Sequence, residues 1–367
     1  MKKIINYLKK EKVLTIAICI ALITCFFVPV DKNYLKYYDY NTLACLFCIL
    51  TVVVGLKNTN IFVLLSRKLV SLFHTRRAVI LTIVLTTFFM DMIVANDMSL
   101  ITLLPLTYIV LHSTNNDNYL AFTYVLQTIA ANMGGMITPY GNPQNLYLYS
   151  YYNIPTLEFI KILLVQSLAV LILLILCIIF VKNEKMEIED KTLLDIPKMK
   201  LIIYIILFFL VILGIFRIIP YKIILILVII VNIIIDKSVF KKIDYALIAT
   251  FIAFFTFSGN MARIPAINQM IYNIVNTNTL LSGLISCQFI SNVPTAIFLS
   301  KFTTDYKNLL IAVNIGSLGT MISSLASLIA LKEYLKYNPK GFIKYIYTFT
   351  IYNTLFLLVL LIITLII

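Results

Sequence analysis

Long apolar runs separated by short polar connectors recur along the whole chain of 367 residues. Of these residues, 61% are apolar and only 13% are charged, and this charged share is about half that of an ordinary soluble domain. An apolar run of about 20 residues can cross a bilayer as a helix. The pattern therefore excludes a soluble enzyme, a disordered chain and a disulfide scaffold, and it predicts an all-α integral membrane protein.

Nine runs are long enough to be transmembrane helices. They are 13–30, 41–56, 119–133, 157–181, 199–219, 221–236, 244–258, 307–331 and 343–366. We expect the first run to be an uncleaved helix, because no small-residue cleavage site follows it. Two shorter stretches, 58–73 and 262–277, are expected to be amphipathic helices at the membrane surface.

Two further apolar stretches, 78–111 and 280–300, contain polar residues near their middles. Suppose that both enter and leave the membrane on the same side and that the N-terminus is cytoplasmic. The cytoplasmic segments are then 1–12, 57–77, 112–118, 182–200, 236–243 and 332–344, and they hold 22 of the 30 Lys and Arg residues. Because this excess follows the positive-inside rule, the charges favour two re-entrant hairpins and a C-terminus outside the cell.

The two hairpins divide the chain into two repeats joined by the charged linker 182–200. The first repeat, 1–181, contains the hairpin 78–111 and an interrupted helix at 119–150. The second, 201–367, has one extra helix, the hairpin 280–300 and an interrupted helix at 307–331. Five crossings precede the second copy, so it is inverted. Inverted repeats with broken helices are an architecture of secondary transporters.

Polar residues occupy the predicted tip of each hairpin. Asn96 and Asp97 lie at the first tip, and Ser291 and Asn292 lie at the second. A carboxylate at mid-membrane costs roughly 2.5–3.5 kcal/mol, which a bound cation, a proton or a water-filled cavity would offset. Alternatively, a protonated Asp97 only caps the turn. For Asp91, local capping and a functional role both remain open.

A helix interruption follows each hairpin. Around Gly134 and Gly135 the backbone cannot stay helical, and its free carbonyl groups could hold a cation. Asn142 and the following proline then form a good helix start, whose N-terminus would face an anion. The matching residues of the second half are Asn314, Gly316, Ser317 and Thr320. The alternative is a kink packed against a neighbouring helix.

The strings ANDMSLITLLPL, GGMITPYGNPQNLYL, ISNVPTAIFLS and NIGSLGTMISSLASL resemble the ion transporter superfamily. This group includes citrate-transporter-like permeases, divalent anion/sodium symporters and arsenite efflux permeases. The resemblance covers nearly the whole chain. It implies an N-in, C-out fold, often a homodimer, with a scaffold domain and a transport domain that moves like an elevator.

In the symporters each tip carries a Ser-Asn-Thr signature. The second tip here keeps Ser291 and Asn292, with Thr295 displaced, whereas the first keeps Asn96 and has Asp97 in place of the threonine. The substrate-binding residues implied are Asn96, Thr138, Asn142, Ser291, Asn292, Thr295, Ser317 and Thr320. Those implied for cation or proton coupling are Asp97, Asn96, Gly134, Gly135, Ser291, Asn292, Asn314 and Gly316.

We therefore expect a secondary active transporter of a small organic anion, citrate-like or dicarboxylate-like, coupled to Na⁺ or H⁺ and without a cofactor. The alternatives are an arsenite or oxyanion efflux permease, a cation/proton antiporter of the same superfamily, a passive channel and, remotely, a membrane-embedded enzyme. The net charge of +14 is spread between apolar runs and does not indicate nucleic acid. The expected partners are the bilayer of the cytoplasmic membrane, the substrate and a second copy.

Overall fold

The computed structural model describes residues 11–94, 96–186 and 196–366. Within these residues the regular structure is helical, apart from one isolated β-bridge between Thr75 and Lys185. The predicted all-α architecture is confirmed. The predictions made for residues 1–10 and for 187–195 of the linker lie outside the described residues.

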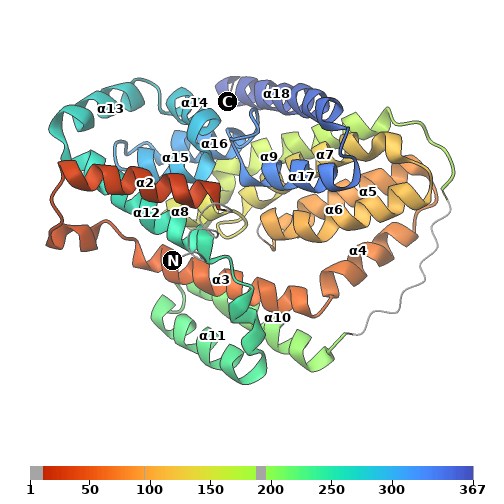
Figure 1. Cartoon of the computed structure of the whole chain (residues 1–367), viewed down its shortest axis with the longest axis horizontal. Helices are drawn as coiled ribbons and strands as arrows, with labels where there is room; N and C mark the ends of the chain where they lie inside the picture. The colour runs from red at the N-terminus through yellow and green to blue at the C-terminus, as the bar shows by residue number, and fades with distance from the viewer. Residues whose placement is uncertain (1–10, 95, 187–195, 367) are drawn as a thin grey trace.

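The α-helices follow one another along the chain with short connections (Figure 1). They are α2 (Lys12–Phe27), α3 (Tyr40–Asn58), α4 (Ile61–Ser71), α5 (Arg76–Asp91), α6 (Asn96–Ser113), α7 (Leu120–Gly134), α8 (Pro143–Tyr151), α9 (Thr156–Ile179), α10 (Lys198–Ile215), α11 (Tyr221–Ile235), α12 (Tyr245–Arg263), α13 (Pro265–Thr277), α14 (Thr279–Ile290), α15 (Asn292–Leu299), α16 (Tyr306–Ile315), α17 (Leu325–Tyr337) and α18 (Phe342–Ile366). Short 3₁₀ helices are η1 (Lys32–Lys36), η2 (Asp117–Tyr119), η3 (Gly135–Ile137) and η4 (Lys237–Lys241).

Several helix starts carry a polar residue whose side chain accepts from a backbone N–H group of the first turn. Asp39 accepts from the Thr42 amide at 3.1 Å, and Asp244 accepts from the Leu247 amide at 3.0 Å. Proline begins α8 and α13, where its missing N–H group is harmless.

The predicted spans correspond to helices. Six helical segments of the described chain are long and apolar enough to cross a bilayer: Tyr40–Asn58, Asp117–Ile137, Thr156–Ile179, Lys198–Ile215, Tyr245–Arg263 and Phe342–Ile366. Val13–Phe27 and Tyr221–Ile235 are shorter apolar helices. The remaining predicted span, 307–331, is the interrupted pair α16 and α17. The chain is a multi-pass membrane protein.

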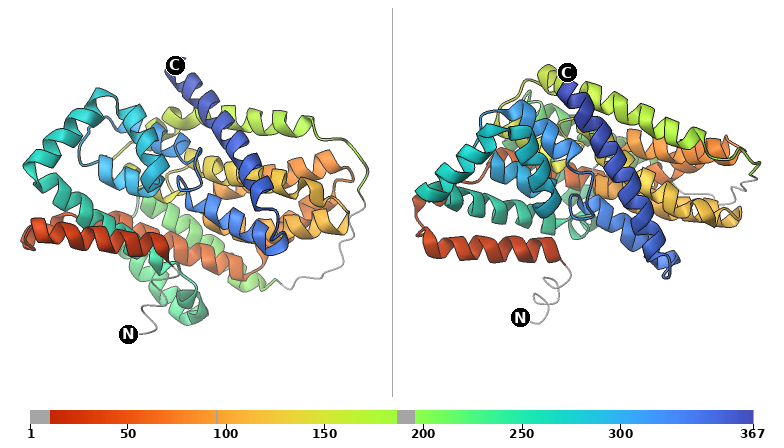
Figure 2. Two further views of the ribbon diagram at one scale, coloured as in Figure 1. Left: turned by 45° about the horizontal axis from the view of Figure 1, so that its top comes forward. Right: turned by 90° about the horizontal axis from the view of Figure 1, so that it is seen from above.

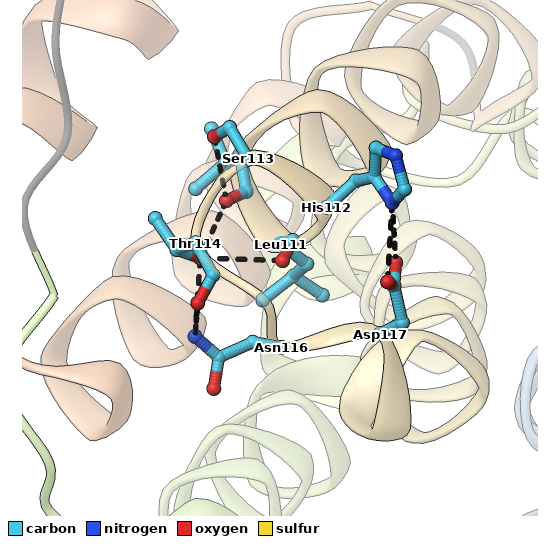
Figure 3. Close-up of polar contacts among 7 residues, drawn as sticks. Leu111, His112, Ser113, Thr114, Asn116 and Asp117 are labelled. Carbon is cyan, nitrogen blue, oxygen red and sulfur yellow. Dashed lines mark hydrogen bonds and ion pairs between the residues drawn. The ribbon is translucent and has the colours of Figure 1, made fainter.

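Each predicted hairpin is a pair of helices that returns to the end where it began. Arg76, at the start of α5, donates through its Nε to the Asn116 side chain just beyond α6. Figure 3 shows the turn after α6, where the His112 ring contacts the Asp117 carboxylate at 3.0 Å. In the second pair, Thr303 donates to the Asn276 side chain at 3.1 Å across the open end. How deep the tips lie in the bilayer stays a prediction.

Contacts between connectors fall into two groups. One group comprises Arg76 with Glu184, Lys242 with Asn58 and Lys344 with Asn118. The other comprises Arg263 with Asp31, Tyr306 with Glu158 and Tyr152 with Thr303. Each of these contacts joins two connectors or helix ends that the positive-inside argument places on the same side of the membrane.

The interrupted helices occupy the middle of the molecule. In Figure 1, α7, α8, α15 and α16 lie between α2, α3 and α12 on one side and α18 on the other. Helix α7 packs against α5, α6, α9, α17 and α18, and α18 crosses the bundle diagonally in Figure 2. Helices α10 and α11 pack on α3, and α2 packs on α12. This arrangement buries the polar segments of both repeats.

Candidate functional site

A chain of hydrogen bonds links the two repeats through Asn132, in the last turn of α7. Its Oδ1 accepts from Asn96 Nδ2 at 3.3 Å and from Ser324 Oγ at 2.7 Å. Its backbone carbonyl accepts from Asn142 Nδ2 at 3.1 Å. Through its side chain and its backbone carbonyl, this one residue contacts the first hairpin tip and the starts of α8 and α17.

The second hairpin tip continues this chain. The Asn292 amide donates to the Ser323 carbonyl at 3.0 Å, and Ser291 Oγ donates to the same carbonyl at 3.2 Å. Because Ser323 directly precedes Ser324, the two tips are joined. We call this cluster the polar centre. It comprises Asn96, Asp97, Asn132, Asn142, Asn145, Ser291, Asn292, Asn314, Ser323 and Ser324.

The two tips are built alike. Asn96 Oδ1 accepts from the amide of the next residue, Asp97, at 2.9 Å, and Asn292 Oδ1 accepts from the Val293 amide at 2.9 Å. Ser291 has φ +73° and ψ 160°, a region adopted almost only by glycine, and such strain is common at functional sites. The two tips thus share the contact between the asparagine side chain and the next amide, and the strained backbone is described at the second tip.

The first interruption begins where α7 ends at Gly134. A side chain at Gly134 would overlap the Phe88 carbonyl group, so glycine allows α7 and α5 to approach closely. The Gly135 carbonyl, predicted to be free for a cation, accepts from the Thr138 amide and from Asn145 Nδ2 at 3.4 Å each. Thr138 Oγ1 also donates to it at 3.5 Å, so this carbonyl is not free, although all three bonds are long.

The second interruption contacts the first directly. Helix α16 ends at Ile315, and α17 restarts after Ser324, whose Oγ accepts from the Ala326 amide at 3.2 Å. Asn314 Nδ2 donates to Asn145 Oδ1 at 2.7 Å. This bond and the Asn132–Ser324 bond cross between the repeats.

The other predicted site residues surround the polar centre. Thr138 Oγ1 donates to the Met92 carbonyl at 3.2 Å, and Thr295 Oγ1 donates to the Ser291 carbonyl at 2.7 Å. Ser317 is fully buried, with its Oγ 3.8 Å from Met133 Sδ. Gly316 packs against the Cys287 side chain.

Thr320 differs from the rest, because it is exposed. Its Oγ1 donates to the Gln288 carbonyl at 3.0 Å. It thus lies at the edge of the second interruption, where its hydroxyl group is already engaged.

Five residues that contact this region were not predicted from the sequence: Asn132, Asn145, Gln288, Ser323 and Ser324. Asn132 lies two residues before the Gly134–Gly135 pair, and Ser324 is a helix N-cap like Asn142. Asn314 also lies two residues before a glycine, Gly316. A comparison of the two halves could therefore have identified Asn132 from Asn314 and Ser324 from Asn142. Asn145 and Gln288 lie inside helices, where a single amide is unremarkable.

Several buried atoms of the polar centre have no hydrogen-bond partner. They are Asp97 Oδ1, Asn132 Nδ2, Asn142 Oδ1 and Asn314 Oδ1. Both amide atoms of Gln144, in the first turn of α8, are also buried and unpartnered. Because most buried polar atoms in proteins are paired, such a cluster is typical of a place that receives a ligand or water.

Four helices begin at the polar centre: α6 at Asn96, α8 after Asn142, α15 at Asn292 and α17 after Ser324. A helix N-terminus carries partial positive charge and unpaired N–H groups, so it favours an anion. No Lys, Arg or His occurs in 92–99, 132–145, 286–297 or 314–328. An anion that bound there would be held by dipoles and amide groups.

Paired and interrupted helices that meet at a buried polar centre are features found in membrane transporters. The sequence matches the family model described as citrate transporter over residues 6–307. The chain therefore belongs to the citrate transporter family, as the resemblance implied.

Two relatives extend this comparison. An uncharacterized transporter of Methanocaldococcus jannaschii is 32% identical over 297 residues, covering 80% of this chain and 81% of the relative. The inner membrane protein YbiR of Escherichia coli is 25% identical over 331 residues, covering 89% and 88%. These similarities extend over both repeats.

Proposed function

We propose that this protein is a secondary active transporter that moves a small organic anion, citrate-like or dicarboxylate-like, together with Na⁺ or H⁺. The family carries the general assignment to transport. The substrate, the coupling ion and the mechanism are our proposal. The single observation that carries it is the convergence of two hairpin tips and two helix interruptions on one polar centre with unpartnered atoms.

The chemistry of the polar centre favours a carboxylate substrate. The Asn132 Nδ2 donor is buried and unpartnered, and four helix N-termini supply further donors. A carboxylate accepts several hydrogen bonds at once, so it can satisfy donors from more than one segment.

Asp97 explains why a cation would accompany the anion. Its Oδ1 is buried and unpartnered, and it follows Asn96 directly at the first tip. An ionised Asp97 would repel a carboxylate unless a cation or proton neutralised it, because like charges repel strongly in a poorly solvated site. We therefore assign the coupling ion to Asp97 and the neighbouring amide oxygens.

We further propose elevator-type movement of one part of the molecule against another. Helices α2, α3, α10, α11 and α12 pack on one another, and the interrupted helices pack among α5–α9 and α14–α18. The first group would be the scaffold and the second the transport domain. The resemblance also implies a homodimer in the cytoplasmic membrane, with the N-terminus inside and the C-terminus outside.

The test is uptake of labelled citrate and succinate by the reconstituted protein. Asn96→Ala and Asn292→Ala should each abolish uptake while the purified protein stays monodisperse. Asp97→Asn should remove the dependence of uptake on the coupling ion. Asn353→Ala, at a buried amide of α18 outside the polar centre, is the control. Full uptake by both tip variants, or an unchanged ion dependence in Asp97→Asn, would contradict the proposal.

A further inference from the structure

Each repeat contains one polar side chain that joins the first hairpin helix to the interruption that follows. In the first repeat this residue is Asp91, the last residue of α5, which is completely buried. Its Oδ2 accepts from the Gly135 amide at 2.9 Å. In the second repeat it is Gln288, in the last turn of α14, whose Oε1 accepts from the Thr320 amide at 2.9 Å. We call Asp91 and Gln288 the anchor residues.

A glycine faces each anchor residue. A β-carbon at Gly135 would lie 2.5 Å from Asp91 Oδ2, and one at Gly319 would overlap Gln288 Oε1. Gly319 also has φ +103°, a conformation that glycine adopts without strain. In both repeats the glycine thus lets the anchor oxygen reach the backbone of the interruption.

Each anchor residue makes further contacts suited to its own chemistry. Asp91 Oδ1 accepts from Ser99 Oγ on α6 at 3.0 Å, so one carboxyl group joins both helices of the hairpin to the interruption. Gln288 Nε2 donates to the Gly316 and Leu318 carbonyl groups at 3.1 Å each. These carbonyls belong to the unwound segment and would otherwise lack donors.

The anchored segments adjoin the polar centre. Gly135 lies three residues after Asn132, and Gly316 lies two residues after Asn314. The side-chain oxygens of Asp91 and Gln288 already accept hydrogen bonds from the Gly135 and Thr320 amides. Unlike the unpartnered atoms of the polar centre, they are not free to bind a ligand. They are therefore placed to act on a ligand through the backbone they hold and not by touching it.

We propose that Asp91 and Gln288 are matching positioning residues, which fix each hairpin tip to the neighbouring interruption so that the two move as one unit. The proposal rests on the proposed transport function for its consequences in uptake. What the two anchors share is an oxygen that accepts from a backbone amide of the interruption. Gln288 has no charge, so the negative charge of Asp91 is not a shared feature. We therefore infer that positioning requires the hydrogen bond and does not require the charge.

This distinction predicts opposite results for two isosteric changes. Asp91→Asn keeps an acceptor for the Gly135 amide and should leave substrate KM within about twofold of wild type. Gln288→Glu keeps the acceptor for the Thr320 amide but turns a second acceptor toward the Gly316 and Leu318 carbonyls. Because two donated bonds are lost, KM should rise at least about tenfold.

Removal of each anchor should loosen only its own repeat. In amide hydrogen exchange on the purified full-length protein, Asp91→Leu should speed exchange across 135–142 and leave 316–324 unchanged. Gln288→Leu should do the reverse, so each variant is the matched control of the other. If Asp91→Leu does not yield a monodisperse protein, Asp91→Ser, whose hydroxyl is too short to reach Gly135, replaces it.

The outcomes separate the alternatives. The positioning role would be supported if each leucine variant exchanges faster only in its own repeat and Asp91→Asn keeps near-normal uptake. Loss of uptake in Asp91→Asn equal to that in Asp91→Leu would overturn it, because the charge would then be needed. Unchanged exchange in both leucine variants would overturn it as well. The exchange measurement needs no substrate, so absent uptake by the wild-type protein would count against the proposed function alone.

Discussion

Asn132 is the residue whose removal tests the polar centre most severely. Its Oδ1 accepts from Asn96 at the first tip and from Ser324 at the start of α17. Truncation by Asn132→Ala leaves both donors in place without an acceptor. Asn96 is 7% exposed and Ser324 is 1% exposed, so bulk water does not reach these donors readily.

The expected cost follows from these two contacts. Each buried donor left unsatisfied costs about 1–3 kcal/mol, so the pair costs about 2–6 kcal/mol. We take the lower end, about 2 kcal/mol, because the bond from Asn96 is long at 3.3 Å. This lowers the equilibrium constant for the correctly joined arrangement about 30-fold, and the apparent KM should rise by up to about 30-fold because only the joined population binds substrate.

The assay is substrate uptake into proteoliposomes over a range of substrate concentrations, together with the melting temperature of the purified protein. Asn132→Asp is the informative partner variant, because it keeps the acceptor but removes the unpartnered Nδ2 donor and adds a negative charge. It should stay folded and lose anion uptake. A normal KM in Asn132→Ala, at a normal melting temperature, would refute the reasoning.

Three further predictions concern other contacts. Asn145→Ala and Asn314→Ala should lower the melting temperature less than additively when combined, because they share one 2.7 Å hydrogen bond; additive effects would show that the bond contributes nothing. Hydrogen bonding to Arg76 lowers the pKa of Glu184, so this ion pair stabilises the fold above about pH 4 and is lost as pH falls through the lowered pKa. The melting temperatures of wild type and Glu184→Gln should accordingly differ at neutral pH and converge in acid, whereas a constant difference would contradict this. Ser291→Gly should relieve about 1–3 kcal/mol of backbone strain and remove a hydroxyl group, so we expect an equal or higher melting temperature with weaker uptake; a lower melting temperature would contradict the strain argument.

Local signals made the helices and their interruptions predictable. Asn, Gly and Pro stand out in apolar runs, so 92–97, 134–143, 291–294 and 314–324 could be recognised without knowledge of the fold. The start of α8 also lies where it was predicted, at Asn142 and the following proline, although the Asn142 side chain accepts no bond from the first turn.

The contacts between these segments were less predictable, because they join residues far apart in the chain. Asn132 and Ser324 are separated by 192 positions and Asn145 and Asn314 by 169, and no local pattern encodes such pairs. Asp91 illustrates the limit. A capping contact within the hairpin, to Ser99, was foreseeable, but its bond to Gly135 depends on how α5 packs against α7. Thr320, predicted to bind substrate, is exposed and donates to the Gln288 carbonyl, a contact that its sequence context did not indicate.

The central claim is that the polar centre moves an organic anion together with a cation. It is tested most directly by uptake of labelled citrate, succinate and arsenite into proteoliposomes, each under an imposed sodium gradient and then an imposed pH gradient. We expect one of the carboxylates to accumulate against its own gradient under one of the two ion gradients. Movement of arsenite without carboxylate flux, or carboxylate flux that only dissipates its own gradient, would contradict the account.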